Sequence, residues 1–179
     1  RDPVEGERIR DLNVTPPVTA SFTENVFYFT TRQPKTIGLI LRSGPTQVEG
    51  TLALKLPEGW KAEPAEIPFK FEKPLTEQNV SVTLTPPADD TVGNLQAELR
   101  VGQKVYRHGY LKIEYPHLPV IHLHPRASAR LVRVDVRTRA KKVAYIMGSG
   151  DEIPAFLEQV GYSVEILSDD DLRNGDFQE

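Results

Sequence analysis

The stretch Leu95-Gln96-Ala97-Glu98-Leu99-Arg100-Val101 alternates apolar and polar side chains. Successive side chains of a strand point to opposite faces, so this period of two predicts a strand with one buried face. Turn residues such as those in Pro57-Glu58-Gly59 and Val101-Gly102-Gln103 separate this stretch from similar ones. The same alternation recurs at Leu52, Leu54 and Leu56; at Ile67, Phe69 and Phe71; at Val80, Val82 and Leu84; and at Val132, Val134 and Val136.

About seven or eight short strands at this spacing, without a helical pattern between them, predict an immunoglobulin-like β-sandwich. We expect the sandwich to occupy residues 18–139, after an N-terminal extension or linker at residues 1–17. Trp60 follows a turn and is expected to be a buried plug beneath it. The sequence therefore predicts a mainly β fold for most of the chain.

Composition excludes several classes of protein. The 179 residues carry 22 basic and 25 acidic side chains, and this near balance argues against a strongly basic nucleic-acid-binding protein. No apolar run approaches the length of a membrane span. The chain has no cysteine, which excludes disulfides, thiolate metal sites and cysteine nucleophiles. The composition itself indicates no cofactor.

A different pattern begins near residue 140. Residues 143–147 (VAYIM) form a continuous apolar run, typical of a strand buried on both faces. Gly148-Ser149-Gly150 predicts a turn, with Asp151 as the N-cap and Pro154 in the first turn of a helix that ends at Gly161. A second strand is expected over residues 162–167. This is the βαβ opening of an α/β domain, and because it buries too little surface alone, we expect residues 140–179 to be a truncated domain.

The connection between the two parts is strongly basic. Residues 126–142 contain seven basic residues and one acid, Asp135. If the valines of the strand over residues 131–137 face inward, Arg133, Asp135 and Arg137 face outward. A solvated outer face explains this pattern, and a docking face for an acidic partner or a glycan is the alternative.

One candidate binding surface is aromatic. Tyr106, His108 and Tyr110 alternate with Val105, Arg107, Gly109 and Leu111, and are therefore expected on one face of a strand. Exposed aromatic stripes of this kind stack sugars in many sandwich modules. The alternative is that the rings pack across strands within the sandwich.

A second candidate is a histidine cluster. His122 and His124 are two residues apart in an extended segment, and His117 lies nearby, so that three imidazoles are available for a metal such as zinc. The prolines around His117 are also explained by a simple connection between strands.

The Gly148-Ser149-Gly150 turn raises the alternative of a dinucleotide site, because it lies between a strand and a helix. Ile153 occupies the position of the third glycine of that fingerprint. Asp151 and Glu152 would repel a pyrophosphate at this helix terminus. Helix capping alone explains Asp151.

Several motifs resemble a known family. Leu56-Pro57-Glu58-Gly59-Trp60 and the later Thr83-Leu84-Thr85-Pro86-Pro87 resemble the sandwich domain appended to alpha-galactosidases and other bacterial glycan enzymes. Tyr115-Pro116-His117-Leu118-Pro119, with residues 142–154 (KVAYIMGSGDEIP), resembles the C-terminal region of long bacterial PIG-L-type (LmbE-like) N-acetylglucosaminyl deacetylases. In that family a zinc-dependent catalytic domain precedes a sandwich and a domain like class I glutamine amidotransferases. The resemblance thus implies a flavodoxin-like or amidotransferase-like identity for residues 140–179.

The chain departs from the family where catalysis is concerned. The family's His-Pro-Asp-Asp-Glu-type run is missing, because His124-Pro125 is followed by Arg126-Ala127. Amidotransferase chemistry needs a cysteine, and none is present. The resemblance therefore implies a non-catalytic accessory region of a sugar N-deacetylase, with no catalytic residue of its own.

Three hypotheses follow. The first is a module that spaces or orients the catalytic domain and contacts other domains of the parent enzyme. The second is a carbohydrate-binding module that uses Tyr106, His108 and Tyr110, with polysaccharide as its partner. The third is a metal-dependent enzyme that uses His117, His122 and His124. The strand edge exposed within residues 143–167 is expected to self-associate with another copy, to pack on the sandwich or to be poorly ordered. The resemblance implies an extracytoplasmic location.

Overall fold

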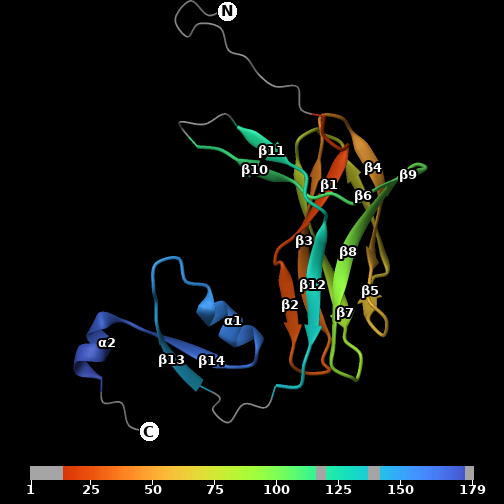
Figure 1. The fold of residues 1–179 in the computed structure, drawn as a ribbon. Helices are drawn as coiled ribbons and strands as arrows, with labels where there is room; N and C mark the ends of the chain where they lie inside the picture. The colour runs from red at the N-terminus through yellow and green to blue at the C-terminus, as the bar shows by residue number, and fades with distance from the viewer. Residues whose placement is uncertain (1–13, 116–119, 137–141, 176–179) are drawn as a thin grey trace, which may run out of the picture.

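The computed structural model describes residues 14–115, 120–136 and 142–175. It is mainly β, with two sheets packed face to face and a small α/β segment beside them (Figure 1). The predicted β-sandwich followed by a βαβ unit is confirmed.

The first sheet has the strand order β1-β3-β7-β5, from β1 (Val18–Phe22), β3 (Lys35–Ser43), β7 (Glu77–Thr85) and β5 (Lys61–Glu63). All three strand pairings in this sheet are antiparallel. The alternation predicted around Val80, Val82 and Leu84 is confirmed, since all three side chains are buried.

The second sheet has the order β2-β12-β8-β4-β6, with β9 paired to β8. Its strands are β2 (Val26–Phe29), β12 (Ser128–Arg133), β8 (Thr91–Val101), β4 (Val48–Lys55), β6 (Glu66–Phe71) and β9 (Lys104–Tyr106). β12 is parallel to β2 and antiparallel to β8, so it joins β2 to the rest of the sheet. At Gly50, a Cβ would lie 2.1 Å from the Arg100 carbonyl oxygen, and the close approach of β4 to β8 therefore requires glycine.

The core lies between the two sheets and takes side chains from both. Leu39 and Val18 come from the first sheet, and Leu95 and Leu131 come from the second. Trp60 is 6% exposed and packs edge to face on Phe29 with ring centroids 4.8 Å apart, which confirms it as a buried plug.

The predicted phase of the strand at residues 131–137 is wrong. Ala129 and Leu131 face the core, so the period of two places Arg133 inward as well, with 4% of its surface exposed. Val132 and Val134 are only partly buried. The sequence favoured inward valines because valine is apolar and arginine is usually exposed to solvent.

Outside the two sheets, β10 (Leu111–Ile113) and β11 (Ile121–Leu123) form a separate antiparallel hairpin at one end of the sandwich (Figure 1). The α/β segment lies beside β2, toward the other end. The segment consists of β13 (Lys142–Ile146), α1 (Ile153–Gln159), β14 (Ser163–Leu167) and α2 (Asp169–Asn174), and β13 pairs with β14 in parallel.

The predicted helix after the glycine turn is confirmed, but its N-cap lies one residue later than predicted. Pro154 lies in the first turn of α1, and Gly161 follows its end with a φ of +100°. The N-cap position is Glu152 rather than Asp151, but the Asp151 carboxylate accepts a hydrogen bond from the Ile153 N–H at 3.0 Å. α2 was not predicted, and its first turn holds Asp169, Asp170 and Asp171 after the Ser168 cap.

The expectation that residues 143–147 are buried on both faces is wrong for this chain. Ile146 and Met147 are each at least half exposed. Within the described residues β13 has β14 as its one strand neighbour, and no residue of α1 is fully buried. The predicted self-association through this edge stays a prediction.

The bounds of the strands can be compared with the predicted domain limits. β1 begins at Val18, β12 ends at Arg133 and β13 begins at Lys142. The expected limit between residues 139 and 140 lies outside the described residues. No helix in the described ranges is long and apolar enough to span a membrane.

Arg133 gives a test of the fold. Its Nε and Nη1 have no hydrogen-bond partner among the described residues, and Nη1 lies 3.6 Å from Oδ1 of Asp90, which is mostly exposed. Buried ion pairs stabilise weakly because desolvation offsets the attraction between the charges. We expect Arg133→Met to leave the free energy of unfolding unchanged or to raise it by about 1–2 kcal/mol in urea titrations.

Asp90→Asn is the paired variant, since it leaves the buried guanidinium without its counter-charge. It should lower the free energy of unfolding by about 1–3 kcal/mol. A loss of more than about 2 kcal/mol in Arg133→Met would show instead that the guanidinium is a net stabilising group.

Candidate functional site

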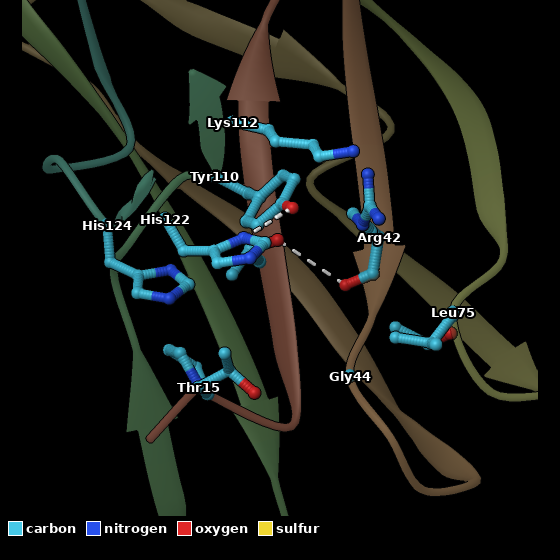
Figure 2. A pocket seen from close by; sticks show the side chains of 11 residues that line it. Thr15, Arg42, Gly44, Leu75, Tyr110, Lys112, His122 and His124 are labelled. Carbon is cyan, nitrogen blue, oxygen red and sulfur yellow. Dashed lines mark hydrogen bonds between the residues drawn. The ribbon is translucent and has the colours of Figure 1, made fainter. Parts of the chain in front are cut away.

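A cavity of about 250 Å³ lies where the β10–β11 hairpin meets β1 and β3 (Figure 2). Its walls come from segments far apart in the sequence, because β3 supplies Arg42 and the hairpin region supplies Tyr110 and His122. The described residues that line it are Thr15, Pro16, Thr19, Arg42, Ser43, Gly44, Leu75, Tyr110, Lys112, His122 and His124.

The Tyr110 ring lies at the centre of this site. The Arg42 guanidinium carbon is 4.1 Å from the ring centroid, a cation–π contact. The Tyr110 hydroxyl is 2.9 Å from Nδ1 of His122, and the rings of His122 and His124 each have centroids 5.8 Å from that of Tyr110. The tyrosine is therefore held on several sides before any ligand enters.

A hydrogen bond also orients the His124 ring. Its Nδ1 lies 3.2 Å from the carbonyl oxygen of Gly109, and because a carbonyl only accepts, Nδ1 donates the proton. In the neutral ring this leaves Nε2 with a free electron pair. His124 is thus oriented as a hydrogen-bond acceptor or a metal ligand through Nε2.

The predicted aromatic stripe does not lie on one strand. Tyr106 ends β9 and packs partly buried against the core, His108 is exposed in an isolated bridge to Arg126, and Tyr110 precedes β10. The strand breaks because its backbone changes partners: the His108 carbonyl accepts from Ala20 of β1 at 3.0 Å. The three residues therefore do not belong to one continuous strand, and their role in sugar binding stays a prediction.

The metal hypothesis is partly outside the described residues, because His117 falls in residues 116–119. His122 and His124 do lie on the same cavity, as their spacing predicted. Within the residues that the structure describes, no three His, Cys, Asp or Glu side chains gather as metal ligands. Metal binding by His117, His122 and His124 stays a prediction.

Asp151, directly after the turn at residues 148–150, is held by two hydrogen bonds. The Asp151 carboxylate accepts hydrogen bonds from the Tyr145 hydroxyl and from the Ile153 N–H. The bond from Tyr145 is the main cause that lowers the pKa of Asp151, and the same bond raises the pKa of Tyr145. A carboxylate thus occupies the start of α1, where a phosphate would have to bind, which argues against the dinucleotide alternative.

Sequence reasoning missed Arg42 and Lys112 as site residues. Arg42 lies on an ordinary alternating strand, and Lys112 is one of many charged surface residues. Both can be recognised as site residues only in the folded chain, where the β10–β11 hairpin lies over β1 and β3. The sequence did indicate part of the site through the tyrosines and histidines of residues 106–124.

Comparison with protein-family models and with curated proteins finds no match. Among solved structures, the chain is similar to a family 123 glycoside hydrolase from Clostridium perfringens, described for glycolipid glycan hydrolysis. The TM-score is 0.35 and the sequence identity is 9%. The similar region covers 88% of this chain and 33% of the hydrolase, so this chain spans about a third of that structure.

The Tyr145–Asp151 bond generates a prediction for pH dependence. A carboxyl group whose pKa is lowered on folding stabilises the fold above its unfolded pKa, and this contribution is lost as the pH falls through the folded pKa. Tyr145→Phe should raise the pKa of Asp151 toward its ordinary value and reduce that contribution. Carboxyl ¹³C signals followed through an acid titration measure this directly.

Tyr162→Phe is the matched control, because it removes a hydroxyl from the same segment while Asp151 keeps its partners Tyr145, Ile153 and Gly148. An Asp151 pKa that is the same in Tyr145→Phe and in the unchanged chain would contradict the assignment.

Proposed function

We propose that this chain is a non-catalytic accessory region of a multidomain sugar N-deacetylase. In this proposal the β-sandwich spaces and orients the neighbouring domains, including the α/β domain that begins near residue 140. The family resemblance of residues 142–154 motivates the identity of the parent enzyme. The structural support is the contact between the sandwich and the α/β segment.

That contact joins α1 to β2. The rings of Tyr28 and Phe156 meet edge to face with centroids 5.1 Å apart, a geometry that aromatic pairs prefer. The Gln159 side chain donates to the Glu24 carboxylate at 2.6 Å. An apolar contact and a polar contact on successive turns of α1 together restrict its rotation against β2. This pair of contacts is the observation that carries the proposal.

The connection between the two parts is itself attached to the sandwich. The Val134 N–H donates to the Phe29 carbonyl at 3.2 Å, and the Asp135 N–H donates to the Asp90 carboxylate at 3.0 Å. Both bonds hold the chain against the sandwich for two residues beyond β12. The connection is held at its start, and α1 packs on β2. Together these contacts favour one orientation of the α/β segment over independent motion of the two parts.

The sequence supports a role without catalysis. The family's catalytic run is missing after His124-Pro125, and Arg126-Ala127 supplies no carboxylate at the corresponding place. If the purified chain, supplied with zinc, released acetate from N-acetylated amino sugars, the non-catalytic part of the proposal would be wrong.

The spacing role predicts that the sandwich and the α/β segment tumble as one body. ¹⁵N relaxation should give amides of β14 the same rotational correlation time as amides of β8. Tyr28→Ala removes the aromatic contact from the sandwich side, and we expect it to shorten the correlation time of the β14 amides while those of β8 change little.

Phe156→Ala tests the same contact from the α1 side and should have the same effect. Ile153→Ala is the matched control, because Ile153 is an apolar and half-exposed residue of the same helix. Independent tumbling already in the unchanged chain, or no effect of either aromatic substitution, would contradict a fixed orientation.

A further inference from the structure

The cavity beside Tyr110 combines an apolar lining with positive charge. Leu75 and Pro16 contribute apolar surface, and Arg42 and Lys112 contribute cationic groups. Among the described residues that line it, none is Asp or Glu. Its volume of about 250 Å³ lies just below the range of about 300–1,000 Å³ usual for sites of drug-sized ligands, which suits a single small ring.

The two cations converge on the same side of the cavity. Figure 2 shows the end of the Lys112 side chain directed toward the Arg42 guanidinium, which lies over the Tyr110 ring. Arg42 pairs with Glu77 at 3.0 Å and Lys112 pairs with Glu114, and neither carboxylate lines the cavity. Each cation thus has a carboxylate partner outside the cavity, and an anion inside the cavity would be attracted by both positive charges.

Arg42 keeps donors for such an anion. A guanidinium has five N–H donors, and the bond to Glu77 involves Nη1. Its contact with the Tyr110 ring restricts the position of the group, which lowers the cost of ordering it when a carboxylate binds. A planar, paired donor set can bind both oxygens of a carboxylate at once.

The remaining walls suit a hydroxylated ring. Nε2 of His124 is left available by the Nδ1 bond to Gly109, and the Tyr110 hydroxyl is held beside His122. Such groups bind sugar hydroxyls, while Leu75 and the edge of the Tyr110 ring offer apolar contact to the C–H bonds of a sugar. A simple inorganic anion would use the cations alone.

We propose that this cavity binds the uronic acid residue of an acidic polysaccharide. Arg42 and Lys112 bind the carboxylate, and the sugar ring lies against Tyr110 and Leu75. This inference goes beyond the spacing role, because it gives the sandwich a ligand of its own. It also replaces the three-residue aromatic stripe with a different set of side chains, in which Tyr110 is shared.

The test is NMR titration of the chain with D-glucuronate, with D-glucose and acetate as separate probes. We expect glucuronate to shift the ring signals of His122, His124 and Tyr110, with much smaller shifts for the other two probes. Arg42→Met and Lys112→Met should each weaken glucuronate binding by about tenfold, since each removes a charge-assisted hydrogen bond.

Arg100→Met is the matched control, because Arg100 forms a similarly exposed ion pair with Glu66 on the other sheet. Equal shifts from D-glucose would overturn the role of the carboxylate, and equal shifts from acetate would overturn sugar recognition. N-acetyl-alanine is a fourth probe, and if it bound more strongly than D-glucuronate, the cavity would be a site for a peptide C-terminus instead. An absence of shifts at these rings with every probe would overturn the site itself.

Discussion

The position of β12 between β2 and β8 is the constraint on which the rest of the structure depends. Leu131 lies opposite Phe27 in the parallel pairing with β2 and opposite Gly93 in the antiparallel pairing with β8. Without β12, the short strand β2 would have no neighbour in the second sheet as the described residues form it. β2 in turn supplies Tyr28, on which α1 packs. The placement of the α/β segment therefore depends on the register of a strand in the sandwich.

This register has a cost at the end of β12. The phase that buries Ala129 and Leu131 also buries Arg133, whose guanidinium is left with incomplete hydrogen bonding. The nearby Asp90 carboxylate serves both the guanidinium and the N–H of Asp135. The same acid thus compensates the buried charge and holds the start of the connection to the α/β segment, so core packing and domain placement are linked at one residue.

Much of the fold is encoded in local patterns that a sequence displays. Val80, Val82 and Leu84 are buried as their alternation predicted, and Pro154 and Gly161 mark the ends of α1. The phase of β12 could not be predicted, because it is set by pairing with strands distant in sequence rather than by its own valines. Only part of the cavity could be predicted, for the same reason. Tyr110 and His122 are close in sequence, but Arg42 is distant and comes next to them only in the fold.

The central claim is that α1 holds the α/β segment in one orientation on the sandwich. Because the chain has no cysteine, single cysteines introduced at the exposed positions Asn94 of β8 and Glu165 of β14 can be spin-labelled selectively. Pulsed electron paramagnetic resonance then measures the distribution of distances between the two labels. The account predicts one narrow distance peak. A broad distribution, typical of two parts joined by a free linker, would contradict it.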